Sequence, residues 1–457
     1  AEPAAFGFLG TTRATISVKD AVIYNKRGAL GLIGGDVEID HAGIWTDHGD
    51  IRLVANGVVT SEVAPSGALP LAEGRLMVSN GSGVFSAAST LAAGGRIDVA
   101  AGEMGINGGA SVGTSTSTAM PAGAVSAELA SLEIDGRGAS GSTGISSFTA
   151  FSDVGRGGDV SVSTRGTLRV LGGGLISSDT YGHGGAGNLS VKAGSLLLDG
   201  SGHQNGARLT NRAAQGNAGI MMVSAADSIE LVNASQISSD SFGVGQAGMI
   251  SMQAGKDIRV LADSFVASNA YASGNAGAIR IASHNLTVDG TGGQQLTQIS
   301  SQAFYVSQGN AGSIDVNTSG ALNLINGGKI VTDTNNIGHA GDIHVTAGSL
   351  LLDSRNHVGL TGIYSSNDFD STGNGGAINI QVAGDAQILQ SAQVSSTTWG
   401  KGNAGDVVFR ANNLEINGRG LGVAAGISSE VAETSGGQGG SITVNVPGHL
   451  KIFDLGL

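Results

Sequence analysis

The stretch GSIDVNTSGALNLINGGKIVTDTNNIGHAG, residues 312–341, contains three short segments in which apolar and polar residues alternate. These segments are SIDVNT (313–318), ALNLI (321–325) and KIVTDT (329–334). Alternation with period two, interrupted by glycine and asparagine, is typical of β-strands joined by turns. The apolar stripe of a helix, with its period of 3.6 residues, is absent. The stretch therefore predicts three strands in about 30 residues.

The stretch begins and ends on a short glycine motif that recurs along the chain. Clear copies are GNAGSI at 309–314, GHAGDI at 338–343 and GNAGDV at 402–407. The last glycine of each of twelve copies lies at Gly95, Gly123, Gly158, Gly187, Gly219, Gly248, Gly277, Gly312, Gly341, Gly376, Gly405 and Gly440, at intervals of 28–35 residues. A repeat of this length indicates a solenoid. Three strands a repeat favour a parallel β-helix, because 29 residues are too few for a propeller blade and twelve blades too many.

Composition narrows the classes of function. Glycine accounts for 78 of 457 residues and charged residues for only 13%, yet 40% are hydrophobic, which excludes a disordered linker. A net charge of −13 argues against nucleic-acid binding and against docking on anionic lipid. No apolar run is long enough to span a bilayer, so we expect no membrane insertion. The absence of cysteine excludes structural disulfides and thiolate metal sites.

The repeat is uniform over residues 91–457 and less regular over residues 1–90, which predicts irregular coils of the same β-helix there. Longer repeats carry extra residues between the second and third strands. These insertions predict a ridge of loops on one side of the solenoid, at residues 135–145, 199–208, 289–298, 353–362 and 417–426. Since no signal peptide opens the chain and its last residues lie within a repeat strand, we expect it to be an internal piece of a longer protein.

A hydroxyl residue follows the aliphatic residue of the third strand by two places, and therefore shares its face. The column consists of Ser147, Ser178, Ser239, Ser268, Ser301, Thr332, Ser365, Ser396 and Ser429. We expect these side chains to point inward. Stacked coil on coil, they would form a ladder in which each hydroxyl donates to one neighbouring hydroxyl and accepts from the other.

An aromatic residue recurs six or seven residues before the last glycine of the motif. It is Phe151 in one long repeat, and the candidate surface contacts are Tyr181, Phe242, Tyr271, Tyr305, Phe369 and Trp399. A row of exposed rings would stack on the sugar rings of a glycan. Alternatively, the rings stack on each other and seal the turn, and this structural interpretation is the favoured one.

Three other constellations were weighed. Asp135, Asp199, Asp289 and Asp353 recur at one position, but each precedes Gly or Ser, which is typical of a turn and not of catalysis. Asp36, Asp50, Asp159, Asp342 and Asp406 follow motif glycines without the dense spacing of calcium repeats, so a turn role is expected. His339 and His344 flank a turn with no third ligand evident. No catalytic, cofactor-binding or metal-binding residue is predicted.

The opening PAAFGFLG (3–10), the strands GLIGGDVEI (31–39) and DHGDIRLVA (47–55), and the later GNAG repeats resemble filamentous haemagglutinin-type proteins of two-partner secretion. The likeness covers essentially the whole chain and places residues 1–90 after a missing secretion domain. It implies a right-handed parallel β-helix, export by an outer-membrane partner, and a location outside the cell on a bacterial surface.

These observations together predict the rod of a cell-surface adhesin or biofilm-matrix fibre that acts without catalysis. We expect self-association or binding to surface glycans, and no cofactor. The alternative is a carbohydrate-binding or polysaccharide-cleaving β-helix. Enzymes of that kind need clustered carboxylates, or carboxylates with Arg or Lys, on one face of the helix.

Overall fold

The computed structural model describes residues 14–456, except 27, 58–68, 70, 91, 151–153, 305–307, 336, 356, 358, 369–370, 420–423, 433–435 and 455. Within these residues the chain is all β, with parallel strands stacked as a solenoid and about three strands a coil. The predicted fold class is thus confirmed. None of the described residues forms a helix that could cross a membrane. Contacts divide the chain into two units, Ala1–Met222 and Val223–Leu457.

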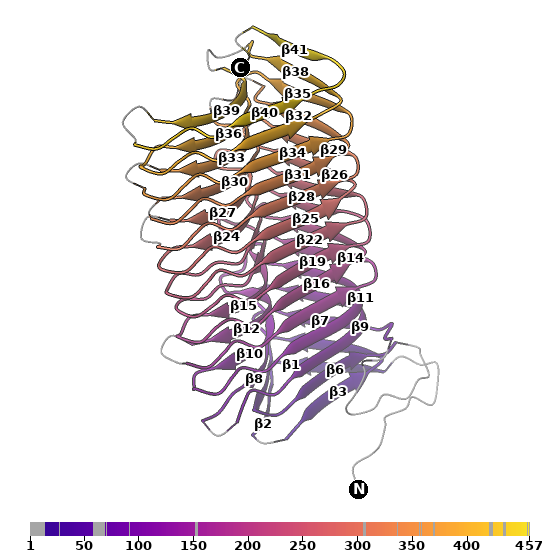
Figure 1. Ribbon diagram of the computed structural model, residues 1–457. Helices are drawn as coiled ribbons and strands as arrows, with labels where there is room; N and C mark the ends of the chain where they lie inside the picture. The colour runs from indigo at the N-terminus through magenta and orange to yellow at the C-terminus, as the bar shows by residue number, and fades with distance from the viewer. Residues whose placement is uncertain are drawn as a thin grey trace. The chain divides into compact units, whose positions relative to one another are not determined.

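The strands of the first unit belong to two hydrogen-bonded parallel sheets, the larger of which contains both the first and the second strands of the coils (Figure 1). The layer of first and second strands consists of β1 (Thr15–Lys19), β3 (Leu30–Gly34), β4 (Asp36–Asp40), β6 (Ile51–Ala55), β7 (Arg75–Ser79), β9 (Ile97–Asn107), β11 (Val125–Asp135), β13 (Val160–Thr164), β14 (Thr167–Leu171), β16 (Leu189–Ala193) and β17 (Ser195–Asp199). The layer of third strands consists of β2 (Val22–Asn25), β5 (Gly43–Asp47), β8 (Gly83–Ala87), β10 (Ser111–Thr116), β12 (Thr143–Thr149), β15 (Gly174–Thr180) and β18 (Arg208–Thr210). The boundary between the units falls within β19 (Met221–Ala225).

The second unit repeats the same arrangement with greater regularity. Its first and second strands are β20 (Ile229–Val232), β22 (Ile250–Ala254), β23 (Asp257–Leu261), β25 (Ile279–Ser283), β26 (Asn285–Asp289), β28 (Ile314–Thr318), β29 (Ala321–Ile325), β31 (Ile343–Ala347), β32 (Ser349–Asp353), β34 (Ile378–Val382), β35 (Asp385–Leu389), β37 (Val407–Arg410), β38 (Asn413–Asn417), β40 (Ile442–Asn445) and β41 (Leu450–Phe453). Its third strands are β21 (Gln236–Ser238), β24 (Phe265–Ala270), β27 (Gln298–Ala303), β30 (Lys329–Thr334), β33 (Gly362–Asn367), β36 (Gln393–Thr398) and β39 (Gly426–Val431).

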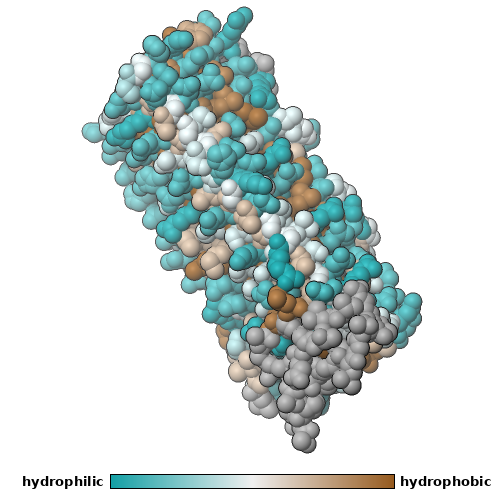
Figure 2. All heavy atoms as spheres, turned by 90° about the vertical axis from the view of Figure 1, so that its right-hand side faces the viewer, coloured by the Kyte–Doolittle hydropathy of each residue, from teal (hydrophilic) through white to brown (hydrophobic). Residues whose placement is uncertain are grey.

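Each strand pairs in register with its equivalent one coil away, so identical positions stack into columns. In the second unit Ile279 pairs with Ile314, and Ile314 pairs with Ile343. All three are fully buried. Because strand side chains alternate between faces, these aliphatic columns fill the interior while the intervening residues face solvent. The face drawn in Figure 2 is accordingly mostly hydrophilic, with apolar residues in small separate patches.

The two repeat lengths arise at the corner between the second and third strands, as predicted. A short coil closes this corner with two left-handed residues, such as Ala262 and Asp263 with φ of 45° and 66°. A long coil opens a loop there instead, as between the end of β26 and the start of β27. Eight residues separate those strands, Gly290 to Thr297, against three between β29 and β30, Asn326 to Gly328. Most of the extra residues of a long coil thus lie at this corner, and two more follow the third strand, where Gly312 lies 11 residues after Ser301 and Gly277 lies 9 after Ser268.

The motif glycines are explained by close approach of neighbouring coils. A Cβ atom added to Gly405 would lie 2.1 Å from the carbonyl oxygen of Gly376, one coil back. The same holds for the first glycine of the motif, since a Cβ on Gly402 would also collide with the backbone of Gly373. No larger residue fits at these positions without moving the coils apart, which explains why both glycines recur with the repeat.

The predicted inward column of hydroxyls is confirmed, but the predicted ladder between hydroxyls forms only in part: Thr114 donates to Ser147 at 2.9 Å, whereas hydroxyls such as Ser178 and Ser396 bond to glycine backbone. Ser396 is fully buried, accepts the N–H of Gly405 at 2.8 Å and donates to the carbonyl of Gly376 at 3.0 Å. Ser178 joins Gly187 and Gly158 in the same way, at 2.9 Å each. We call this arrangement the serine–glycine bridge. In these coils the hydroxyl bonds to the motif glycines on both sides of it.

Variants of the bridge show what the position requires. In one coil of the first unit the column is occupied by Asn211, whose side-chain amide accepts from Gly219 N at 2.9 Å and donates to Gly187 O at 2.7 Å. Asn211 replaces both bonds of a serine, and the expected column did not include it. Thr332 is also buried, but its hydroxyl donates to the glycine of its own motif, Gly341, at 2.6 Å.

Candidate functional site

Three rings stack on one another in the second unit, one on each of three successive coils. Phe242 and Tyr271 lie with ring centroids 4.7 Å apart and planes 4° apart. Tyr271 and Phe304 are likewise 4.7 Å apart, at 5°. We call these residues the aromatic stack. Its spacing equals the distance between neighbouring strands, so each ring covers the face of the next.

The stack corrects the composition of the predicted aromatic column. Strand register places Ala270 beside Ala303, so the residue that follows on each strand brings Tyr271 to Phe304. The predicted partner Tyr305 is outside the described residues, as are Phe369 and Phe151. On the next coil Asn335 occupies the aromatic position and donates to Asp368 at 2.9 Å. The aromatic column is therefore interrupted.

Tyr181 and Trp399 are the other described members of the predicted row. Both are partly exposed, and each makes contacts with its own surroundings. Tyr271 is stacked on both faces, and Phe242 and Phe304 each have one face covered by it, whereas sugars pack against free ring faces. For Phe242, Tyr271 and Phe304 the geometry therefore favours the structural interpretation, in which the rings seal the turn.

The aspartates weighed as catalytic or calcium residues are bonded to backbone in the described structure. Asp289 accepts from the N–H of Thr291 at 2.8 Å, which is an Asx turn at the start of a long loop. Asp342 accepts from the N–H of Ala377, one coil on, at 2.8 Å. Among the described residues no group of three or more His, Asp or Glu side chains is arranged to hold a metal ion.

An exposed ladder of side chains connects the coils of the second unit at the second position of the glycine motif. Asn310 accepts from the N–H of His339 at 2.8 Å, and His339 Nδ1 accepts from the N–H of Asn374 at 3.0 Å. Asn374 in turn accepts from the N–H of Asn403 at 2.9 Å. We call this set the asparagine ladder. It assigns His339 a role in holding coils together.

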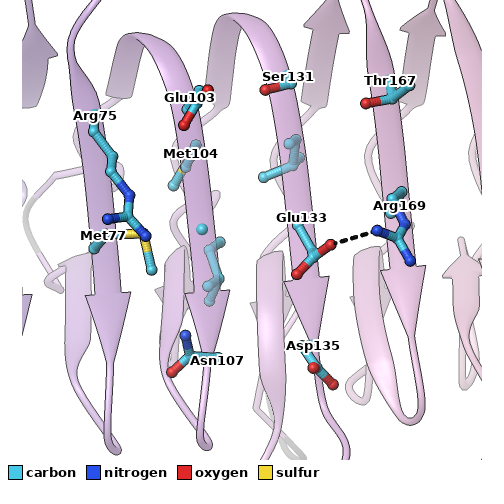
Figure 3. A pocket seen from close by; sticks show the side chains of 13 residues that line it. Arg75, Met77, Glu103, Met104, Asn107, Ser131, Glu133, Asp135, Thr167 and Arg169 are labelled. Carbon is cyan, nitrogen blue, oxygen red and sulfur yellow. Dashed lines mark ion pairs between the residues drawn. The ribbon is translucent and has the colours of Figure 1, made fainter.

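The first unit carries a hollow of about 410 Å³ on the outer face of β7, β9, β11 and β14 (Figure 3). Register aligns Met77, Gly105, Glu133 and Arg169 across these four strands. Gly105 has no side chain, and Met77 leans over it: a Cβ on Gly105 would lie 2.6 Å from the Met77 sulfur. The missing side chain leaves a depression in a face that is otherwise covered.

Charged groups of both signs surround this hollow. Glu133 and Arg169 form an ion pair at 3.0 Å. At one end Arg137 holds Asp135 at 2.6 Å, and this contact lowers the pKa of the Asp135 carboxyl. Arg75 and Glu103 face one another in register, yet neither forms an ion pair with a described residue. The hollow thus offers one guanidinium and one carboxylate to a ligand.

The repeat pattern does not predict this cluster, because its members lie far apart in the chain and follow no column. The one available signal was Gly105, a glycine at an outward position within a long alternating strand. A glycine inside a strand often marks a bulge or a close approach. In the sequence the other members, such as Arg75 and Glu103, cannot be told apart from ordinary charged residues that face solvent.

In comparisons with known proteins, the chain matches no family model and no curated sequence. The fold and the contacts described above therefore define its class. It is a parallel β-solenoid whose coils are joined by hydrogen bonds from conserved positions of its own repeat, inside through the serine–glycine bridges and outside through the asparagine ladder.

Proposed function

We propose that this chain is the rod segment of a secreted bacterial adhesin or biofilm-matrix fibre, exported by an outer-membrane partner and acting by association. The observation that carries the proposal is the use made of the polar residues. Serine, asparagine and aspartate side chains at repeated positions are bonded to the backbone of the neighbouring coil. Side chains committed to joining coils support a mechanical role, and the family resemblance supplies the location.

The location is tested by protease treatment of intact cells of the producing organism, followed by detection of the chain with an antibody. We expect the chain to be degraded on intact cells and lost when the outer-membrane partner is deleted. A chain that is protected in intact cells and released only by lysis would contradict a surface location.

Association is tested on beads coated with the purified chain. The residues between the strands of two long loops, 200–207 and 290–297, would be replaced by the short turn found at 326–328, which leaves the strands intact. If the loops form the contact, we expect the shortened variant to lose bead aggregation. Full aggregation by that variant would reject the loops as the contact surface and leave adhesion to another surface.

A polysaccharide-cleaving β-helix is the second candidate, and the hollow beside Gly105 is the observation that favours it. Glu103 and Glu133 lie on adjacent strands near two arginines. However, a general acid needs a raised pKa, whereas the pKa of Asp135 is lowered and Glu133 is paired with Arg169. Release of reducing ends or unsaturated sugars by the intact chain, abolished in Glu103→Gln, would overturn the non-catalytic proposal.

A further inference from the structure

Four aromatic residues follow one another across the outer face of the third-strand layer in the first unit. They are Tyr24, Trp45, Phe85 and Phe148, on β2, β5, β8 and β12; β8, β10 and β12 are labelled at the lower left of Figure 1. Register pairs Tyr24 with Trp45, and Trp45 with Phe85. The Trp45 and Phe85 centroids are 5.6 Å apart, and those of Phe85 and Phe148 6.5 Å. We call this set the aromatic stripe.

Two rings of the stripe, Trp45 and Phe85, lie over glycines of their own strands. A Cβ on Gly43 would fall 2.4 Å from the indole nitrogen of Trp45, and one on Gly83 would fall 3.2 Å from the ring of Phe85. Trp45 and Phe85 therefore each lean along their own strand and cover the glycine two residues earlier. The planes of Trp45 and Phe85 are tilted by 45°, so neither ring hides the face of the other. Trp45 remains 46% exposed and Tyr24 55%.

The surroundings of the stripe are almost uncharged. Outward positions on β8, β10 and β12 carry glycine, alanine and serine beside the two phenylalanines. The one carboxylate on the outward positions of these strands and of β5 is Asp47, which accepts from the Tyr24 hydroxyl at 2.7 Å. A highly charged partner finds no complementary charge here, whereas the half-buried Ser111, Ser115 and Ser146 offer hydroxyls to a neutral one.

The area of the stripe decides between a second protein copy and a small polymer. Tyr24 and Trp45 are about half exposed and Phe85 and Phe148 less so, and together the four rings present roughly 200–350 Å². A stable protein interface needs about 800 Å² on each partner, so a second copy would be held weakly by this surface. A polysaccharide chain is narrow enough to lie on one row of rings, and its sugar C–H faces pack on the exposed ring faces.

We propose that the aromatic stripe is a binding site for a neutral polysaccharide, with successive sugars packed on Tyr24, Trp45 and Phe85 across successive coils. The inference rests on the proposed function, of which it names a ligand class and a site. It assigns binding to residues outside the predicted aromatic column.

The test uses the two tryptophans of the chain, Trp45 and Trp399, which are equally exposed at 46%. In Trp399→Phe, Trp45 is the sole tryptophan and reports binding by its fluorescence. The probes are cellohexaose, N-acetylchitohexaose and mannohexaose, with oligoalginate as the acidic comparison. We expect a saturable blue shift with at least one neutral probe, and no such shift with oligoalginate.

Calorimetric titration of the full chain then compares three variants. We expect Trp45→Ala to bind the neutral probe about tenfold more weakly or worse, because one stacking contact is lost. Gly43→Ala keeps every ring but displaces the indole, and a several-fold loss is expected. The matched control Trp399→Ala should bind as the unsubstituted chain does. Unchanged binding by Gly43→Ala, when circular dichroism shows the fold intact, would overturn the proposed ring geometry.

Three outcomes would overturn the glycan site: no response to any neutral probe at millimolar concentration, unchanged affinity in Trp45→Ala, or preference for oligoalginate. Loss of a dimer in Trp45→Ala, seen by sedimentation, would show that a second copy is the occupant instead. The bead assay separates this inference from the proposed function. If Trp45→Ala no longer binds the glycan but still aggregates beads, adhesion uses another surface and only the glycan site is rejected. If the intact chain binds glycan but does not aggregate beads, the adhesive-rod proposal is rejected and the glycan site is retained.

Discussion

Substitution of Ser396 by alanine tests whether the serine–glycine bridge holds the coils together. The change removes a fully buried hydroxyl. Two backbone groups, the N–H of Gly405 and the carbonyl of Gly376, then lose their hydrogen bonds to it. A buried polar group without a partner costs about 1–3 kcal/mol, so the two together amount to roughly 2–6 kcal/mol. The free energy of unfolding of a folded protein is typically about 5–15 kcal/mol, so this loss is a large part of it.

The assay is guanidinium unfolding of the full chain combined with hydrogen exchange of the Gly405 amide. Stability in a repeat array is set by neighbouring coils, so we expect faster exchange around residues 376–405 together with a lower unfolding midpoint. Ser396→Thr keeps a hydroxyl, as Thr332 does in the same column. Its free energy of unfolding should fall by less than half as much as that of Ser396→Ala. The exposed Ser273→Ala serves as the matched control. If Ser396→Ala and Ser273→Ala unfold and exchange alike, the bridge contributes nothing.

Three further predictions concern the second unit. Gly405→Ala places a Cβ 2.1 Å from a backbone oxygen and should lower the free energy of unfolding by at least about 3 kcal/mol, while Gly436→Ala, with no atom within 4 Å, should change it little, as checked by denaturant midpoints. Ala234→Gly, at φ 59°, should stabilise the chain by about 0.5–1 kcal/mol, whereas Ala282→Gly within β25 should destabilise it similarly; equal signs in thermal melts would count against the assigned turn. Burial raises the pKa of Asp333 from 3.8 to about 7, and its Oδ1 has no hydrogen-bond partner, so the stabilisation from its protonated form is complete below pH 4 and is lost as pH rises to 7. Unfolding of Asp333→Asn should lack this decline, and a parallel pH profile in the variant would assign the decline to other groups.

Much of the architecture follows from the sequence because strand periodicity is local. The alternation in KIVTDT and the spacing of the motif glycines were enough to predict three strands a coil and an inward serine column. The corner at which loops are inserted was predictable for the same reason, since an insertion is visible wherever copies of a repeat are compared. Each of these conclusions needs only the chain's own copies as reference.

The partners of the buried hydroxyls were decided by the tertiary structure. The sequence shows that Ser365 and Ser396 share a column, but the distance between coils and the direction of each side chain decide whether a serine meets a serine or a glycine. The structure selects Gly376 and Gly405, because motif glycines without side chains bring their backbone within reach of the hydroxyl. Asn211 occupies the same column and makes the same kind of bonds, although it is an asparagine and not a serine.

The surface features depended still more on the fold. Counting back from the motif glycine placed Tyr305 beside Tyr271, whereas strand pairing brings Phe304 there, because the corner after the third strand varies in length while the strand register does not. Tyr24, Trp45, Phe85 and Phe148 are separated by irregular intervals in the sequence, and only parallel stacking gathers them on one face. The sequence by itself determined which residues alternate and repeat. The tertiary structure decided which of them meet, because contacts between coils follow the pairing of strands and not the number of residues in the loops between them.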